Sequence, residues 1–365
     1  MRPAINLAQP RRLVICLGPG GVGKTTFSAA LALEAAIRGR SVDVMTIDPA
    51  PRLIDALGLE GDAAQPRPVD LAQLHAKAAG RLRAMRLDPK ATFDGLIERY
   101  APSAATRDAI MIGRIYQNLS NALAGVADYM AMERLLALHH EEAANLIVLD
   151  TPPAQSALDF LDAPQRMIEL IGSRAISLLG TSRGALRTPA AIVDFAARAV
   201  LSAFDRITGL HLLTDVRAFV TNFEGMYEGF AARALEAQAL LSDPLTTLAV
   251  LITTPEPERT AQTCQFAEAL HARKICIGAV VVNRMMKPLP DDAEIERAKL
   301  PVALKRKLRR NLADFAALKD REASAIAELR AAFGDDTRIF ASYDYGREPR
   351  SLKDLAALAA NLRPL

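Results

Sequence analysis

The feature that most constrains this chain is a glycine-rich turn near its start, Gly18-Pro-Gly-Gly-Val-Gly-Lys-Thr25, which satisfies the pattern G-x-x-x-x-G-K-[ST]. The apolar run Leu13–Leu17 before it predicts a buried strand, and helix-like sequence follows from Lys24. In this context the glycines let backbone N–H groups point at phosphate, and Lys24 would reach the outer phosphates and take part in catalysis. The Thr25 hydroxyl would ligate Mg²⁺. The pattern therefore predicts a binding loop for ATP and Mg²⁺ made of Gly20, Gly21, Val22, Gly23, Lys24, Thr25 and Thr26.

Two aspartates follow apolar runs that we interpret as neighbouring strands. Asp150 follows Leu146–Leu149, so its carboxylate would reach the same sheet edge as the loop and hold Mg²⁺ through a bound water. Asp48 follows Val42–Ile47, where it would orient the water that attacks the γ-phosphate and thus act in catalysis. The alternatives are a helix-capping role for Asp150 and a turn-forming role for Asp48.

Short apolar runs alternate with helical patterns along the chain, which predicts an α/β fold with a doubly wound, mostly parallel sheet. The expected strands are 13–17, 42–47, 146–149, 218–221, 248–253 and 277–282. Two helix-rich intervals, about 70–142 and 159–215, are too long for single crossover helices. We therefore expect one P-loop domain over residues 1–365, with a helical subdomain inserted from these intervals. The apolar stripes of that subdomain would either face its own core or line a groove that binds a client.

Composition excludes several other kinds of protein. The 45 Lys and Arg residues nearly balance the 42 Asp and Glu residues, so we expect no nucleic-acid partner. The local basic run Lys305–Arg310 is interpreted as a solvated helix face, with contact to DNA or to an anionic membrane as the alternative. No apolar segment is long enough for a signal peptide or a membrane span. We therefore expect a cytoplasmic protein that is at most peripheral to a membrane.

Further short motifs carry a resemblance to a known family. Besides the phosphate loop they are Thr46–Ala50, Asp150–Pro153, Met226–Phe230, Thr254–Glu256, Val281–Asn283 and Tyr345–Arg350. With this set the chain resembles the ArsA-like, arsenite-pump-type branch of the deviant Walker P-loop ATPases, which is related to the ATPase that targets tail-anchored proteins. The resemblance covers nearly the whole chain and is similar to a bacterial single-domain subgroup. It implies an enzyme that hydrolyses ATP.

The resemblance also implies roles for individual residues. Asp48 would be the switch I aspartate that positions the attacking water. Asp150 would open switch II and relay the state of the γ-phosphate to the helical subdomain. Asn283 would read the adenine, and the loop around Pro349 would close over the base. Since members of the family are dimers that sandwich two nucleotides, we expect a nucleotide-driven dimeric switch acting on a protein partner, such as a membrane protein, or on a hydrophobic client.

Pro19 departs from the family pattern, in which this position is a lysine that crosses the dimer to the partner's nucleotide. Proline has neither a charge nor an N–H group with which to replace that lysine. We expect either a homodimer that hydrolyses ATP slowly or a heterodimer with a lysine-bearing paralogue. An arginine that reaches across instead, such as one near Arg52 or Arg347, is the alternative.

The cysteines depart from the family as well. Cys16, Cys264 and Cys276 have no paired spacing, so we expect neither a zinc site nor the thiol cluster that would bind arsenite. Two other functions stay open beside the client-handling switch. One is a subunit that energises an arsenite or anion exporter, and the other is a regulatory subunit that binds ATP but hydrolyses it poorly.

Overall fold

The computed structural model describes residues 5, 11–61, 63–74, 79–113, 116, 124–172, 221–334, 337–344, 346 and 349–365. The chain divides into two compact units, each described by itself below. The first unit contains Met1–Leu87, Leu138–Leu158 and Leu240–Leu365. The second contains Asp88–Ala137 and Asp159–Ala239.

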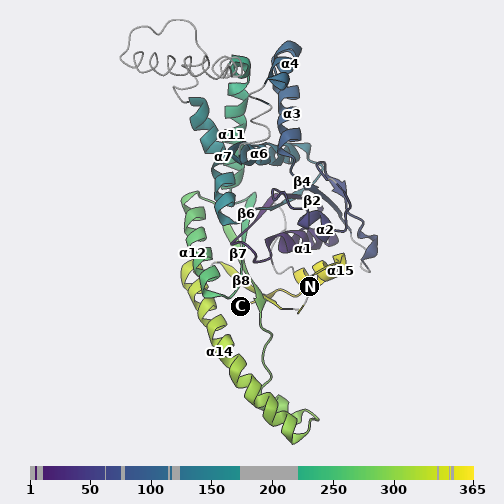
Figure 1. Cartoon of the computed structure of the whole chain (residues 1–365), viewed down its shortest axis with the longest axis vertical. Coiled ribbons are helices and arrows are strands. Elements are labelled where there is room, and N and C mark those ends of the chain that lie inside the picture. Colours follow the sequence, from purple (N-terminus) through teal and green to yellow (C-terminus); the bar gives the residue numbers. More distant parts are fainter. Residues whose placement is uncertain are drawn as a thin grey trace, which may run out of the picture. The chain divides into compact units, whose positions relative to one another are not determined.

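The first unit is built on a sheet of nine strands in the order β3-β4-β2-β5-β1-β6-β7-β8-β9 among the described residues (Figure 1). The strands are β1 (Leu13–Leu17), β2 (Ser41–Thr46), β3 (Arg67–Pro68), β4 (Arg81–Arg86), β5 (Leu146–Asp150), β6 (Thr247–Thr253), β7 (Ile277–Met285), β8 (Arg338–Tyr343) and β9 (Arg363–Pro364). Neighbouring strands pair in parallel except at the two edges, where β3 and β9 are antiparallel. This arrangement confirms the doubly wound, mostly parallel sheet.

Helices cover both faces of this sheet. The described helices that lie wholly within this unit are α1 (Lys24–Ile37), α2 (Arg52–Ala56), the short η1 (Leu71–Gln73), α12 (Pro257–Ala272), α13 (Asp292–Arg297), α14 (Val302–Phe333) and α15 (Leu352–Ala360). All residues of β1 are buried, although successive side chains of a strand point to opposite faces. Val14 and Cys16 pack in the core that includes α1 and α15, and a strand buried on both sides explains the unbroken apolar run LVICL.

Strands outside the predicted set carry weaker apolar patterns. β4 (RLRAMR) alternates arginine with apolar residues, and Arg83 forms a bidentate ion pair with the buried Asp43, at 2.6 Å between Nη2 and Oδ2. Residues 81–86, which the expected helical interval 70–142 includes, are thus a sheet strand of the first unit. The expected strand 218–221 lies outside the described residues except for Thr221, which is helical.

The second unit contains only helices within its described residues. They are α3 (Pro89–Tyr100), α4 (Ala104–Ile112), the short η2 (Glu224–Met226) and most of three helices that cross the unit boundaries, α6 (Ala124–Glu141), α7 (Ala154–Gly172) and α11 (Tyr227–Ser242). Aromatic rings form much of the core: Phe93 packs against Tyr116 and Phe223, with ring centroids 5.1 and 6.0 Å apart.

A buried ion pair lies beside this aromatic core. The guanidinium of Arg233 contacts the carboxylate of Glu133 at 2.9 Å and stacks on the ring of Tyr100, 3.9 Å from its centroid. Tyr129 donates its hydroxyl hydrogen to the same carboxylate. These contacts compensate the cost of removing two charges from water.

The apolar stripe in the interval 159–215 can be followed only at its start. At its start the stripe is partly buried and packs against the core of the second unit through Met167, Ile168 and Ile171. This part of the stripe therefore faces the core rather than a groove. The remaining stripe positions, 176–204, lie outside the described residues. None of the helices in the described ranges has the length and apolar composition that crossing a bilayer requires.

Candidate nucleotide site

The glycine-rich turn forms the connection from β1 to the N-terminus of α1. Gly21 and Gly23 have φ angles of +78° and +99°, a left-handed region that side chains disfavour. Gly18 lies against the next strand so closely that a Cβ there would be 2.0 Å from the carbonyl oxygen of Ile252. The glycines therefore let the loop curl tightly at the carboxyl edge of β1 and β6, where parallel α/β sheets bind ligands.

Lys24, the first residue of α1, points its amine back into the loop. Its Nζ donates to the carbonyl oxygen of Pro19 at 2.9 Å, and the residue is only 7% exposed. Burial lowers the pKa of Lys24, while the carboxylates of Asp150 and Asp48 oppose that effect. Both aspartates on which the site prediction rests thus act on Lys24.

Asp150 ends β5 in a buried cluster of hydroxyl groups. Its Oδ2 accepts from the Thr46 hydroxyl at 2.9 Å and its Oδ1 from the Ser28 hydroxyl at 3.2 Å, and the Thr25 hydroxyl also hydrogen-bonds to it. Burial raises the pKa of Asp150 to about 6, against the opposing effect of these hydrogen bonds and of Lys24.

This cluster suits a hard divalent cation. Magnesium prefers oxygen ligands, and here a buried carboxylate and the hydroxyl of Thr25 lie within hydrogen-bonding distance of each other. A cation next to Asp150 would stabilise its ionised form, which burial disfavours. The residues predicted to ligate Mg²⁺ therefore fit that ion.

Asp48 lies in the turn after β2 and is linked to the same cluster. Its backbone N–H donates to Thr46 Oγ1 at 3.2 Å, so one threonine hydroxyl contacts both Asp48 and Asp150. Asp48 Oδ1 accepts from the N–H of Ala50 at 2.9 Å, which is the turn-forming role that was the alternative for this residue. The side chain is half-buried, and its charge also acts on Lys24. The turn-forming hydrogen bond therefore leaves Asp48 next to the site.

Asn283 on β7 contacts the phosphate loop directly. Its Nδ2 donates to the carbonyl oxygen of Val22 at 2.8 Å, and a Cβ at Gly23 would come within 2.7 Å of this nitrogen. The next residue, Arg284, has a left-handed φ of +58°, and its N–H donates to Asn283 Oδ1. The amide is therefore held in a single orientation beside the loop.

The end of β7 is fastened to α14 immediately after this contact. The N–H of Met286 donates to Glu322 Oε1 at 2.7 Å, and the amine of Lys319 donates to the Met286 carbonyl oxygen. Lys319 also pairs with Glu322 at 2.9 Å. Met286 is three positions after Asn283, so the phosphate loop and α14 are joined through one short segment.

The remaining predicted site residues are placed less closely together. Gly20 faces Pro153 of the segment after β5, since a Cβ on Gly20 would lie 3.9 Å from that ring. Thr26 is half-buried in the first turn of α1. Pro349 lies in the described segment before α15, whereas Tyr345, Arg347 and Glu348 lie outside the described residues.

Sequence reasoning missed three side chains of the site. Ser28 and Thr46 hold the Asp150 carboxylate, and Ser28 could have been found four residues after Lys24 on the same face of α1. Arg259, in the first turn of α12 after β6, is near enough to Lys24 for its positive charge to lower the pKa of the amine. No motif singled out this arginine, because its position depends on the sheet order.

Comparison with known proteins agrees with this geometry. The chain is 29% identical to an uncharacterized protein of Streptomyces coelicolor, over 95% of this chain and 75% of that protein. It is 25% identical to the ATPase GET3 of Ajellomyces dermatitidis over 77% of this chain and 75% of that protein. The ATPase get3 of Neurospora crassa is 29% identical over 48% of this chain and 49% of that protein. The anion-transporting ATPase family matches residues 11–315, which is most of the chain. The chain therefore belongs to this ArsA-type family of P-loop ATPases and is an enzyme that hydrolyses ATP.

Proposed function

We propose that this chain binds ATP with Mg²⁺ on the loop Gly18–Thr26 and works as a nucleotide-driven switch on a protein partner or hydrophobic client. The observation that carries the proposal is the convergence of Lys24, Asp48 and Asp150 on the N-terminus of α1, with Thr46 bonded to both aspartate residues. Few other reactions need one buried cation, one metal-binding carboxylate and a second carboxylate around a phosphate loop.

Each residue has a distinct task in this proposal. Backbone N–H groups from Gly20 to Lys24 bind the phosphates, and the Lys24 ammonium neutralises their outer oxygens. Thr25 and Asp150 hold Mg²⁺, which supplies charge stabilisation at the β- and γ-phosphates when bound. Asp48 accepts a hydrogen bond from the attacking water and orients it. Asn283 donates to or accepts from the edge of the adenine.

The switch in this proposal begins at Asp150. Thr151, the next residue, donates its hydroxyl to the Cys16 carbonyl oxygen at 2.7 Å, and Pro153 then lies beside Gly20. The chain continues directly into α7, which extends into the second unit. A change in the contacts of Asp150 would therefore be passed along the chain into the helical unit, which we propose handles the client.

The chemistry of Cys16 argues against an arsenite-stimulated exporter subunit. Burial raises the pKa of the Cys16 thiol to about 12, and the residue is enclosed in the core around β1. A thiol ligand must lose its proton to bind a soft metal ion or metalloid, and this one is poorly placed to do so. The client-handling switch is thus the function that the site supports best.

Asp48→Asn tests the catalytic assignment. The variant should bind MgATP about as tightly as the wild type but hydrolyse it at least ~100-fold more slowly, because a water-positioning carboxylate is lost. Lys24→Ala is the matched control, since it should lose both binding and turnover. If Asp48→Asn loses binding and turnover together, Asp48 has only its turn-forming role.

The missing lysine at Pro19 defines the dimer that we propose. A cation supplied to the transferring phosphoryl group is worth about 10³ to 10⁵ in rate. We attribute this cation either to a lysine-bearing paralogue in a heterodimer or to Arg259 in a homodimer, since the charge of Arg259 already acts on Lys24.

Hydrolysis rates separate the two dimers. If Arg259 is the cation, Arg259→Ala should slow the pure wild-type protein strongly, and adding Pro19→Lys should restore turnover. If a paralogue is required, the pure protein should be slow with or without Arg259, and mixing should accelerate it. Rapid hydrolysis by the pure Arg259→Ala variant would contradict both assignments.

A further inference from the structure

Between β7 and β8 the chain forms a helical hairpin that we call the arm, residues 291–321. It consists of α13, a turn and the first part of α14 (Figure 1). None of residues 302–321 is buried, and the buried positions of α14 begin at Glu322. The arm therefore extends beyond the sheet of the first unit and contributes little to its core.

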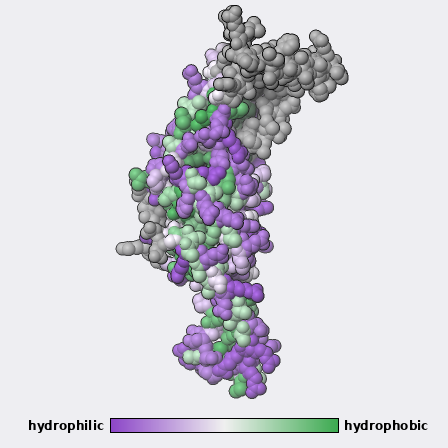
Figure 2. Space-filling view, turned by 90° about the vertical axis from the view of Figure 1, so that its left-hand side faces the viewer, coloured by the Kyte–Doolittle hydropathy of each residue, from purple (hydrophilic) through white to green (hydrophobic). Residues whose placement is uncertain are grey.

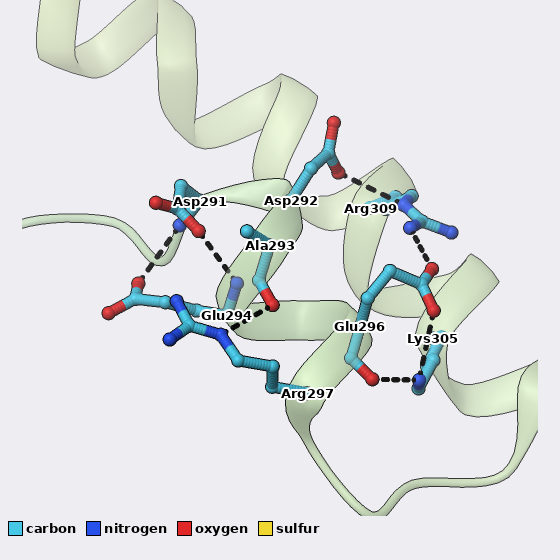
Figure 3. Close-up of polar contacts among 8 residues, drawn as sticks. All are labelled: Asp291, Asp292, Ala293, Glu294, Glu296, Arg297, Lys305 and Arg309. Carbon is cyan, nitrogen blue, oxygen red and sulfur yellow. Dashed lines mark hydrogen bonds and ion pairs between the residues drawn. The ribbon is translucent and has the colours of Figure 1, made fainter.

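Ion pairs within the arm fasten its two helices together (Figure 3). Arg309 of α14 contacts Asp292 of α13 at 3.0 Å and also binds Glu296. Nζ of Lys305 lies 3.1 Å from the carboxylate of Glu296 and donates to the backbone carbonyl oxygen of Glu296 at 2.6 Å. The other two acidic residues of this segment, Asp291 and Glu294, are used in the capping box of α13. The acidic side chains of α13 are thus engaged inside the hairpin.

Several further cations of the arm carry no such partner. The structure gives no ion pair to an acidic side chain of the described residues for Lys299, Arg306, Lys307 and Arg310. All four are exposed, and Lys299 lies at the turn. The internal ion pairs therefore leave an excess of positive charge on the tip of the arm.

Large apolar side chains are exposed among these cations. Around the turn, Leu300 is 38% exposed, Val302 76% and Leu304 47%. Figure 2 shows the end of the arm as a mainly hydrophilic surface with hydrophobic residues set in it. A tip that combines uncompensated cations with exposed aliphatic side chains has the chemistry of a membrane-surface contact.

We propose that the tip of the arm docks on an anionic lipid surface. Lys299, Arg306, Lys307 and Arg310 would contact the headgroups, while Leu300 and Val302, on either side of Pro301, would enter the interfacial layer. The apolar residues stand at the reversal of a hairpin that projects from the sheet. Nucleic acid would use the cations but gain nothing from these aliphatic side chains.

Vesicle sedimentation tests the proposal with the full chain. The wild type should bind phosphatidylcholine vesicles that contain about one third phosphatidylglycerol at low salt, and should bind pure phosphatidylcholine weakly. The triple variant Arg306→Gln, Lys307→Gln, Arg310→Gln should bind on the order of 100-fold more weakly, at about fivefold per cation. The variant Leu300→Ser, Val302→Ser should lose roughly tenfold without any change in charge.

A matched control separates this contact from general electrostatic attraction. Arg330, Arg338 and Arg363 are exposed outside the arm, and changing all three to Gln removes the same positive charge. This control should bind within about twofold of the wild type. All variants should retain the thermal melt of the wild type, because every altered side chain is exposed or half-buried.

Three results would overturn the proposal. One is a wild-type protein that fails to sediment with anionic vesicles at low salt. Another is an equal loss of binding in the control and the arm variants. The third is light scattering that shows the wild type as an oligomer which Leu300→Ser, Val302→Ser dissociates, with vesicle binding unchanged. In that case the tip is an interface between protein copies.

Discussion

Substitution of Gly18 by alanine tests how the phosphate loop is anchored to the sheet. The added Cβ would lie 2.0 Å from the carbonyl oxygen of Ile252 and 3.1 Å from its carbonyl carbon. Ile252 cannot move away easily, because β6 pairs with β1 on one side and with β7 on the other. Either the loop leaves its position or the centre of the sheet is distorted.

The cost can be worked from these contacts. Alanine at the φ of +150° found for Gly18 costs about 1–3 kcal/mol. Overpacking against the backbone adds about 1–3 kcal/mol. We expect Gly18→Ala to reduce the free energy of unfolding by about 2–6 kcal/mol, which corresponds to a melting temperature lowered by roughly 3–8 °C for a chain of this length.

Gly21→Ala is the matched control for backbone strain alone. Gly21 has a φ of +78°, and nothing lies within 4 Å of the position that its Cβ would take. This variant should lose only about 1–2 kcal/mol. Urea denaturation of both variants, followed by circular dichroism, measures the difference. Equal destabilisation of the two would refute the idea that close packing against β6 fixes the loop.

Three further perturbations test other parts of the molecule. Burial and the neighbouring Asp159 raise the pKa of Asp128 to about 6, so its contribution to stability is present below about pH 4 and is lost as the pH rises through 6. The free energy of unfolding should therefore fall between about pH 4.5 and 7, and Asp128→Asn should reduce this fall by about 1–2 kcal/mol. The effect is no larger because water screens the half-buried carboxyl group. Arg233→Leu should cost about 3–5 kcal/mol by leaving Glu133 buried and unpaired, and adding Glu133→Gln should recover part of that loss in chemical denaturation. Asn283→Ala should raise the Kd for ATP and reduce the preference over GTP in calorimetric titration, whereas an unchanged ratio would rule out its adenine role.

Much of the central sheet could be predicted because its strands are buried on both faces. The expected run 13–17 coincides with β1, the run 42–47 is shifted by one residue from β2, and the run 248–253 begins one residue later than β6. β4 could not be recognised in this way, because its arginines give an alternating pattern with no long apolar run. The ion pair that makes Arg83 compatible with a sheet involves Asp43, forty positions earlier, and local sequence does not reveal it.

The candidate site, like the sheet, has a part that local sequence predicts and a part that depends on contacts distant in the sequence. The loop and Asp150 follow from motif and strand order, because parallel strands bring their carboxyl ends to one edge. The hydrogen bonds of Ser28 and Thr46 depend on the register in which Thr46 lies beside Asp150, which motif spacing does not specify. The contact of Asn283 with Val22 depends further on the left-handed residue after it, and no glycine or asparagine marks Arg284 as such a position.

The clamp between Met286 and Glu322 gives α14 the mechanics of a lever. About 20 residues of helix, or about 30 Å at 1.5 Å per residue, lie between this pivot and Val302. A rotation of only about 5° at the pivot would then displace the far end by about 2.6 Å. Since Asn283 joins the phosphate loop three residues before the pivot, a small movement of the loop would be enlarged at the tip without any rearrangement of the sheet.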